Sequence, residues 1–244
     1  MLFRLAAVVG AFCLAVQAGT SWAHPCHEGA EVTSIQPLSS VRAGFFGAQD
    51  KRLFRLADVY LPGKAAIPSA ARLALRDNVD RYGRQAAHVF NDKSWWQGRL
   101  LKRGDAVIVA GDASVACLAA LRAAESEAQK AQRGVWKRPA FQLSALNHES
   151  MEPFMGQFVV ITGLVASVGD RKRRLYLNFG QNWEQDFTVS VVKSGRGAFK
   201  ERKAGALARL QALTGKTVRV RGVLEQRQGP LIRLADEAQI EILE

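Results

Sequence analysis

The chain has 244 residues, of which 48% are apolar, and it carries 34 Lys and Arg against 22 Asp and Glu, a formal net charge of +12. This apolar content excludes a wholly disordered chain, and the length allows one large or two small domains. The positive charge favours an anionic partner, either nucleic acid or a membrane surface. A basic surface that only keeps the protein soluble is the alternative that charge leaves open.

The first 23 residues have the pattern of a secretory signal peptide. Arg4 precedes an apolar run over residues 5–16, and the segment ends in Ser21-Trp22-Ala23, which has the small-x-small form of a cleavage site. The run is shorter than the roughly 20 residues that a membrane-spanning helix needs. We therefore expect a soluble, exported protein that resides in the bacterial periplasm or is secreted.

Removal of residues 1–23 leaves two cysteines, Cys26 and Cys117. In an oxidising compartment they can form one disulfide that ties the N-terminal arm to the body of the protein. Two free thiols are the equal alternative, because Cys117 lies among apolar residues and fits a small core side chain. His24, Cys26 and His27 are ligands suited to copper or zinc, but a flexible terminus closes such a site poorly, and no metal is expected there.

The chain from residue 30 to residue 90 has the alternation of apolar and polar residues that is typical of strands. Turn-forming residues separate the runs. Residues 71–76 alternate as well, and there a short strand and a helical turn fit equally well. Strands are predicted at residues 31–35, 40–46, 51–59 and 82–90.

Two helices are predicted after these strands. Ser94 is placed as the N-cap of a short helix over residues 94–103. The second helix is capped by Asp112 or Ser114, and its outward face, which carries Glu125, is interpreted as solvated. Its apolar residues recur at three- and four-residue spacing: Val115, Leu118, Leu121, Ala124, Ala128 and Ala131.

The second half of the chain has the pattern of another β-rich domain. Residues 141–155 lose periodicity and gather small and polar residues, so they are predicted to be a linker. One helix over residues 200–213 precedes the final strands, and about five strands with such a helix fit a small Greek-key barrel. The strands are predicted at residues 157–162, 164–168, 174–179, 187–192, 216–224, 231–234 and 240–243.

Three segments, in matching order, resemble the staphylococcal nuclease (thermonuclease) family. Asp80-Arg81-Tyr82-Gly83-Arg84, followed by an apolar strand, is similar to the family's Asp-x-Tyr-Gly-Arg signature. Residues 54–63 are similar to its strand ending in Arg-Leu-x-x-Val/Ile-Asp-x-Pro-Glu, and Gly134-Val135-Trp136 resembles its closing Gly-x-Trp. With the pattern of the second half, this implies a mainly β fold with helices (α+β), in which an SNase-like OB barrel is followed by a second small OB-like barrel.

The resemblance implies Ca²⁺-dependent hydrolysis of phosphodiesters, with an acidic cluster for the ion, a carboxylate for the attacking water and two arginines for the phosphate. Arg55 and Arg84 stand at the positions of the family's two arginines. The alternative is that they are structural cations paired with aspartates. Tyr60 and Gly63 stand at two of the carboxylate positions, and the family's Asp-Gly-Asp-Thr stretch has no counterpart. The chain is therefore of uncertain enzymatic activity, and Ca²⁺ is expected only if it is active.

A relocated carboxylate is the remaining route to a nuclease. Asp58 and Asp80 are the candidates, with Asp50 as a third. Asp58 faces either the site or the core, whereas Asp80 more readily fixes the turn at the entry of its strand. The segment between Gly63 and Asp80 is also short for the family's first helix plus a strand.

The densest aromatic stretch, residues 176–188, is similar in outline to segments that follow the nuclease part of exported thermonuclease-like proteins. OB barrels stack bases on aromatic side chains beside a basic groove. The candidates for binding nucleic acid are therefore Tyr176, Trp183, Arg173 and Arg174. The alternative is that the rings form the core of a small barrel and that the charged run at 171–174 is a solvated turn.

The sequence thus predicts a signal peptide (1–23), an SNase-like domain (24–140), a linker (141–155) and a second OB-like domain (156–244). The function that fits best is binding of nucleic acid or another polyanion, with little or no hydrolysis. A Ca²⁺-dependent nuclease with a rebuilt active site is the alternative, and an envelope scaffold that meets other proteins is the third hypothesis.

Overall fold

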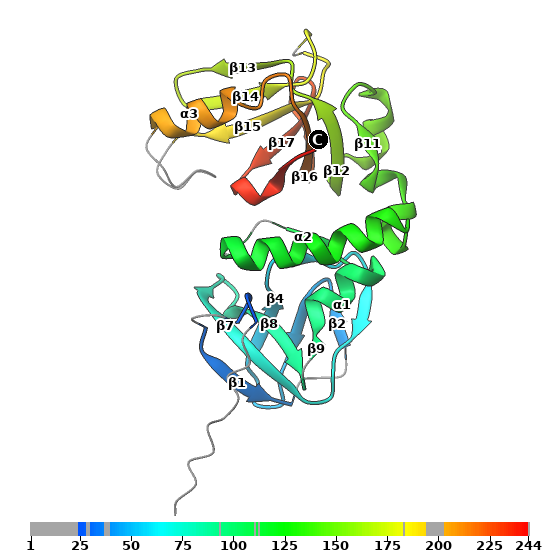
Figure 1. Cartoon of the computed structure of the whole chain (residues 1–244), viewed down its shortest axis with the longest axis vertical. Helices are drawn as coiled ribbons and strands as arrows, with labels where there is room; N and C mark the ends of the chain where they lie inside the picture. Colours follow the sequence, from blue (N-terminus) through cyan, green and yellow to red (C-terminus); the bar gives the residue numbers. More distant parts are fainter. Residues whose placement is uncertain are drawn as a thin grey trace, which may run out of the picture.

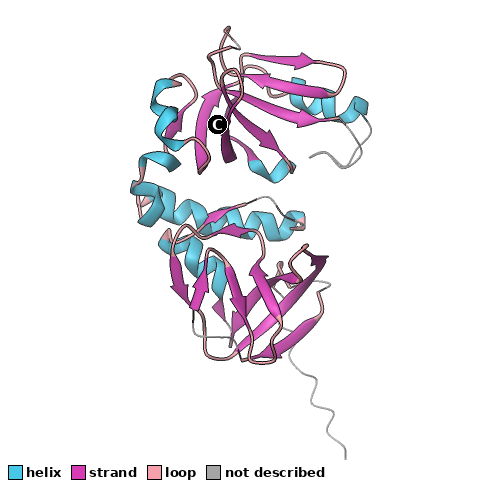
Figure 2. Ribbon diagram, turned by 180° about the vertical axis from the view of Figure 1, so that it is seen from behind, coloured by secondary structure: helices cyan, strands magenta, loops and turns pink. Residues whose placement is uncertain are grey.

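Two curved β-sheets lie at opposite ends of the molecule, and the long helix α2 (Val115–Lys130) runs between them (Figure 1). The computed structural model describes residues 24–27, 30–36, 40–92, 94–109, 111, 113–182, 184–193 and 203–243. Seen from behind, both ends consist mainly of strands; most helices lie in the middle and along one side, and α3 lies on the other side of the second sheet (Figure 2). The fold is mainly β with a few helices, as the sequence predicts.

The first sheet has the strand order β1-β7-β8-β4-β3-β2-β6. Neighbours pair in antiparallel fashion except β4 and β8, which are parallel. β1 and β2 follow one another in the chain but pair at opposite ends of the order, with β7 and with β3, so the sheet curls as in an OB barrel. The strands are β1 (Val32–Ile35), β2 (Ser40–Arg42), β3 (Phe45–Gly47), β4 (Leu53–Leu56), β6 (Lys64–Ala66), β7 (Ala71–Val79) and β8 (Arg84–Asn91).

Three short strands accompany this sheet. β9 (Ser94–Trp95) pairs with β8, and β5 (Val59–Tyr60) pairs with β10 (Val107–Ile108). The segment at 71–76, which fits a strand or a helical turn by sequence, is a strand, and the described residues between β5 and β7 contain no helix. The short segment that follows Gly63 therefore runs as the strand β6 along β2.

The helix α1 (Trp96–Arg103) starts later than predicted. Ser94 does not cap it, because Ser94 and Trp95 pair with β8 as a strand, and the N-cap residue is Trp95 with no side-chain hydrogen bond. Gly104 ends the helix in the left-handed conformation, with φ 72°, which glycine adopts without steric cost.

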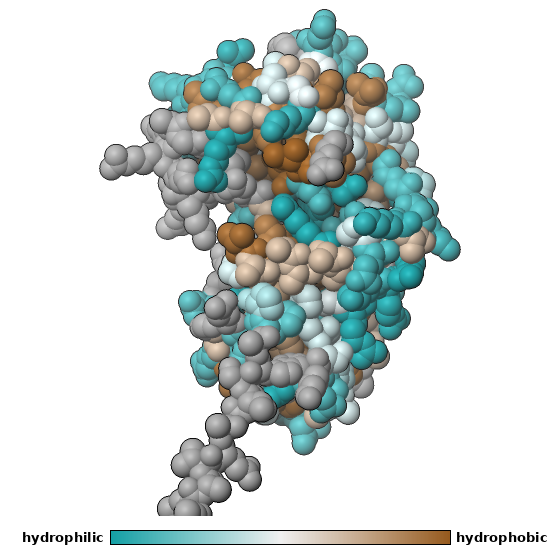
Figure 3. All heavy atoms as spheres, viewed as in Figure 1, coloured by the Kyte–Doolittle hydropathy of each residue, from teal (hydrophilic) through white to brown (hydrophobic). Residues whose placement is uncertain are grey.

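The helix α2 has the predicted cap, since the Ser114 side chain accepts a hydrogen bond from the Cys117 amide. Its predicted apolar face is only partly right: Leu121 is buried, but Val115 at the first turn is 90% exposed. The surface along α2 is pale in Figure 3, in keeping with its exposed alanines, and becomes hydrophilic toward the C-terminal end of the helix. The interpretation of Glu125 as solvated is wrong, because this carboxylate is buried.

The second sheet has the order β11-β12-β16-β17-β15-β14-β13. Here the parallel pair is β15 with β17, and the consecutive strands β12 and β13 again pair at opposite ends of the order. Apart from the outer strands β6 and β11, this order and its one parallel pair repeat those of the first sheet, so both sheets have the strand order of an OB barrel. The strands are β11 (Leu143–Ser144), β12 (Phe158–Leu164), β13 (Ser167–Asp170), β14 (Arg174–Asn178), β15 (Thr188–Val192), β16 (Thr217–Gln226), β17 (Pro230–Leu234) and β18 (Ile240–Ile242).

Further helices connect and flank the second sheet. α3 (Lys203–Gln211) lies between β15 and β16, where the sequence places a helix. The residues predicted as a linker, 141–155, include β11, which pairs with β12, and a 3-10 helix; the domain boundaries stay a prediction. The 3-10 helices are η1 (Gly134–Lys137), η2 (Pro139–Phe141), η3 (Glu149–Phe154) and η4 (Glu237–Gln239).

The core of the second sheet extends into the first half of the chain. Val107, Ala128 and Trp136 belong to the same buried cluster as the strands of the second sheet. The Tyr60 ring stacks on Phe158, with centroids 4.7 Å apart. The two halves therefore share apolar contacts rather than meeting only through a connecting segment. Within the described part of the chain, no helix combines the length and the apolar character needed to cross a membrane.

Candidate nucleic-acid interface and a buried histidine cluster

Arg84 is fixed at the start of β8 by the turn that precedes it. Its Nε lies 2.8 Å from Oδ2 of Asp80, and the backbone amides of Tyr82 and Arg84 donate to the other oxygen of that carboxylate. Desolvation raises the pKa of Asp80, but the two amides and the Arg84 guanidinium together keep it below its ordinary value. Asp80 is therefore an ionised anchor for the turn and for Arg84.

The strand register places Arg84 on an outward face together with Arg55. Leu53 and Arg55 alternate with buried residues along β4, Arg84 lies opposite Leu53, and Phe45 lies opposite Arg55. Residues directly opposite one another point to the same side of a sheet. We call Phe45, Leu53, Arg55, Tyr82 and Arg84 the Arg84 face.

Aromatic rings and cations alternate on the Arg84 face. The Arg84 guanidinium lies 3.8 Å from the centroid of the Phe45 ring and 4.7 Å from that of Tyr82, while Arg81 lies 4.8 Å from the Tyr82 centroid. Phe45 is 39% and Tyr82 58% exposed. Exposed rings beside arginines are the elements with which proteins hold single-stranded nucleic acid, through base stacking and phosphate contacts.

Asp58 does not reach this face. It is buried in the turn between β4 and β5 with φ 60°, a left-handed conformation that Asp tolerates better than most residues, and its Oδ2 lies 2.9 Å from Nε2 of the fully buried His88. Asp50, the third carboxylate considered, is paired with Arg52 at 2.8 Å. Asp80 touches the Arg84 face, and both of its oxygens are bound there.

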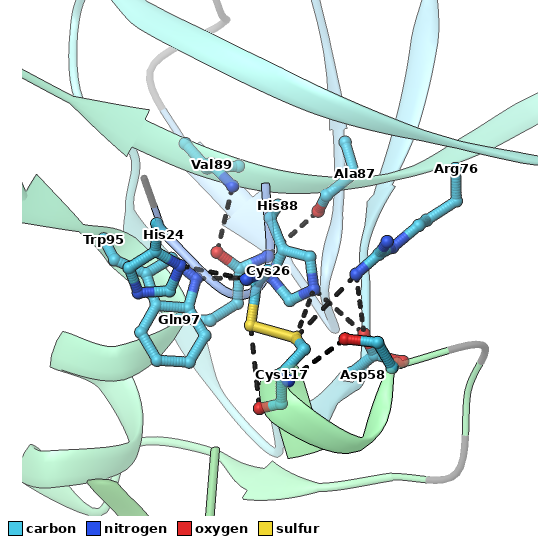
Figure 4. Close-up of a disulfide and its surroundings, with 11 residues drawn as sticks. His24, Cys26, Asp58, Arg76, Ala87, His88, Val89, Trp95, Gln97 and Cys117 are labelled. Carbon is cyan, nitrogen blue, oxygen red and sulfur yellow. Dashed lines mark hydrogen bonds and ion pairs between the residues drawn. A yellow bond between two sulfur atoms is a disulfide. The ribbon is translucent and has the colours of Figure 1, made fainter. Parts of the chain in front are cut away.

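Asp58 belongs to a buried cluster that also contains a disulfide (Figure 4). Cys26 and Cys117 are joined by a disulfide across 91 positions of sequence, and Sγ of Cys117 lies 3.6 Å from Nε2 of His88. Arg76 approaches the same sulfur at 3.8 Å and the Asp58 carboxylate at 3.9 Å. The sequence analysis does not single out His88, although it is the lone polar residue in the apolar run of residues 86–90, all of which are buried in β8.

The hydrogen bonds of His88 define its role. The Trp95 indole Nε1–H donates to Nδ1, so in the neutral ring Nε2 carries the proton and donates to Asp58. Although Cys26, Cys117 and His88 lie close enough to share a metal ion, the sulfurs are bonded to each other and Nε2 carries the proton that it donates to Asp58. The cluster therefore fits a structural role, in which its side chains pack around the disulfide, rather than a metal site.

Burial lowers the pKa of His88, although Asp58 acts in the opposite direction; Arg76 adds to the lowering. Burial also lowers the pKa of His24, helped by the charges of His88 and His27. Below about pH 6.5, the ordinary histidine value, the unfolded chain therefore binds protons that the folded protein does not. We expect the free energy of unfolding to fall as the pH decreases from 7.5 to 5.5, with His88 contributing at most about 1.4 kcal/mol per pH unit.

Urea unfolding at pH 7.5, 6.5 and 5.5 measures this dependence. His88→Gln removes the fully buried imidazole. The variant should therefore be less stable than the natural protein at pH 7.5, but its free energy of unfolding should fall less steeply as the pH decreases. Equal urea midpoints for the natural protein at the three pH values, or an unchanged decline in His88→Gln, would contradict the assignment.

In the second sheet, a hollow of about 280 Å³ contains part of the predicted aromatic site. Tyr176 lines it together with Arg171 and Arg227, and Asn178 and Thr188 add polar groups. Tyr176 and Asn178 are half-buried on one side of β14, whereas Leu175 and Leu177 point into the core, as the alternation of a strand requires.

The other residues of that prediction lie elsewhere. Arg173 is exposed and Arg174 reaches Ser190 Oγ at 3.4 Å, and neither lines the hollow. Trp183 lies outside the described residues. Phe179 and Phe187 are buried with ring centroids 5.0 Å apart, so these two rings are core, as the alternative interpretation holds.

Comparison with known families gives one match. Residues 56–138 match the model of the staphylococcal nuclease homologue family, from the end of β4 to the residue after η1. The match covers about a third of the chain; it includes Arg84, begins one residue after Arg55, and leaves the second sheet outside. No curated protein matches the chain.

Proposed function

We propose, from the match of residues 56–138 to the staphylococcal nuclease homologue family, that this is an exported protein that binds nucleic acid or a similar polyanion without the family's hydrolytic chemistry. The observation that carries the proposal is the Arg84 face. It keeps two arginines and exposes two rings, but Tyr60 and Gly63 stand where the resemblance places carboxylates, and Asp58 and Asp80 are held by other side chains.

The engagement of Asp58 and Asp80 by other side chains argues against hydrolysis of the family type. Ca²⁺ needs several oxygen ligands, and the attacking water needs a base. Tyr60, at the position where the resemblance places an aspartate, packs on Phe158, and Gly63 offers no side chain at the position of the catalytic glutamate. Asp58 is held by His88 and Asp80 by Arg84.

Two further features support binding of a strand. The hollow at Tyr176 combines one ring on β14, a strand of the OB-barrel face that usually contacts oligonucleotides, with Arg171 and Arg227 from the adjacent turns. The net charge of +12 supplies a long-range attraction for polyanions. Export, proposed from residues 1–23, is compatible with the disulfide, because oxidising compartments preserve such bonds.

Binding of a fluorescein-labelled 20-nucleotide DNA strand by residues 24–244, followed by anisotropy in EDTA, tests the proposal. We expect the affinity to fall steeply between 50 and 200 mM NaCl, because phosphate contacts release counterions. Arg84→Met and Arg81→Met should each weaken binding several-fold and reduce the salt slope by about one. The control is Lys130→Met, which removes one exposed cation from α2.

Arg81→Met keeps the result interpretable if Arg84→Met perturbs the turn, since Arg81 has no carboxylate partner among the described residues. Binding that is insensitive to salt and to both variants would contradict the proposal and favour a scaffold that meets proteins. A parallel digestion with millimolar Ca²⁺ examines the nuclease alternative. Ca²⁺-dependent cleavage that Arg84→Met abolishes would overturn the claim that hydrolysis is absent.

A further inference from the structure

A larger hollow, of about 710 Å³, lies on the first barrel and shares no lining residue with the Arg84 face or the histidine cluster. One wall is the segment from Pro62 to Ser69, which includes β6. The opposite wall is α1, and the residues around Gly134 and Arg138 close the third side. Its volume is within the range of about 300 to 1,000 Å³ that is usual for small-molecule sites.

The lining of this hollow is strongly cationic. Lys64, Arg99, Arg103 and Arg138 line it, all with exposed side chains, and Asp105 is the single carboxylate among its lining residues. Asp105 lies 2.9 Å from Arg103. Within the described chain, no carboxylate pairs with Lys64, Arg99 or Arg138. Three positive charges around one concavity are therefore left without compensation.

These charges repel one another. Arg99 and Arg103 are four residues apart on α1, a spacing at which like charges destabilise a helix, and Asp105, which pairs with Arg103, offsets only part of this repulsion. An anion bound in the hollow relieves this repulsion, and the concave shape concentrates the field where the anion lies. Planar guanidinium groups favour phosphate, since they can present two N–H donors to two of its oxygens.

The back of the hollow is rigid and apolar. Trp96, Leu100 and Val135 are buried against it, and the Val135 amide donates to the Gly104 carbonyl at 2.8 Å. A Cβ on Gly104 would lie 2.3 Å from the Arg133 carbonyl oxygen, so only glycine allows this approach. The contact fixes the end of α1 against η1 and thereby holds the two walls that carry Arg103 and Arg138.

We propose that this hollow binds a phosphate-bearing ligand of about nucleotide size, with Arg99, Arg138 and Lys64 as the phosphate contacts. The phosphate can belong to a free nucleotide or to the backbone of a nucleic-acid strand, and the chemistry that recognises it is the same. The proposal does not depend on the Arg84 face, because the two sites share no residue.

Calorimetric titration of residues 24–244 at 20 mM NaCl with 5′-AMP, and with adenosine as the uncharged control, tests the site. We expect 5′-AMP to bind and adenosine to give no binding heat. The double variant Arg99→Met/Arg138→Met should weaken 5′-AMP at least tenfold. The matched control Lys130→Met/Lys137→Met removes two exposed cations outside the hollow and should leave the affinity unchanged.

Competition identifies the source of the phosphate. If a 10-nucleotide DNA strand displaces 5′-AMP, and Arg99→Met/Arg138→Met weakens binding of that strand, the hollow binds the backbone of a nucleic-acid strand. If the DNA strand does not compete with 5′-AMP, the ligand is a free nucleotide. Absence of 5′-AMP binding, or equal affinity in the double variant, would overturn the proposal. Loss of 5′-AMP binding in Arg84→Met, with Arg99→Met/Arg138→Met unaffected, would also overturn the proposal, because it would place the phosphate on the Arg84 face. This outcome would leave the proposed binding of a DNA strand by the Arg84 face standing, so the two proposals can fail separately.

Discussion

Removal of the Cys26–Cys117 disulfide is expected to lower the free energy of unfolding by about 4 to 5 kcal/mol, the loop-closure entropy of a cross-link that spans 91 positions. The double variant Cys26→Ala/Cys117→Ala keeps both buried positions apolar, so the loss reports the cross-link more than the packing. Urea unfolding of the natural protein with and without a phosphine reductant, beside the variant, measures the effect.

The variant also serves as the control, because the reductant should not change its urea midpoint. Equal midpoints for the oxidised and reduced natural protein would contradict a stabilising role for the bond. The position of the disulfide adds to the effect expected from the length of the loop that it closes. It ties residue 26 to the first turn of α2, beside the cap at Ser114, and it lies against His88, Asp58 and Arg76.

The strands of both barrels were accessible from sequence because one face of each is buried, which produces an alternation with a period of two. The segment at 71–76 fits a strand and a helical turn equally well by sequence, because apolar residues occupy both faces of the strand: Leu73, Ala74 and Leu75 are all buried. The segment is a strand because β7 pairs with β1 along one edge and with β8 along the other. Such long-range pairing leaves no signal in the local sequence.

The residues of the proposed sites are harder to predict than the strands. Arg84 was found because a local motif carries it, whereas Asp58 faces the interior because of the backbone conformation of one turn. The cationic hollow escaped detection because its charges come from separate segments of the chain, at Lys64, Arg99 and Arg138, and only the fold brings them together. Composition indicated an excess of charge but not where it gathers.

Glu125 illustrates a different limit, since helical periodicity tells which residues share a face but not what covers that face. The carboxylate is buried between the halves of the chain, where it accepts from Nη1 of Arg221 at 2.8 Å and from the Ile108 amide at 2.7 Å. Arg221 is also buried and reaches Glu241 at 3.1 Å. This buried ion pair connects α2 with β16.

We expect Glu125→Gln to lower the free energy of unfolding by about 3 to 5 kcal/mol, because it leaves the buried Arg221 charge without its main partner. The control on the same helix is Glu127→Gln, which breaks the exposed pair with Lys102 at 2.9 Å and should cost less than about 1 kcal/mol. Glu125→Leu/Arg221→Met removes both charges, so it should recover much of the stability that Glu125→Gln loses. Urea unfolding of the four proteins measures these differences, and a cost of Glu125→Gln no larger than that of Glu127→Gln would show that the buried pair does not hold the two barrels together.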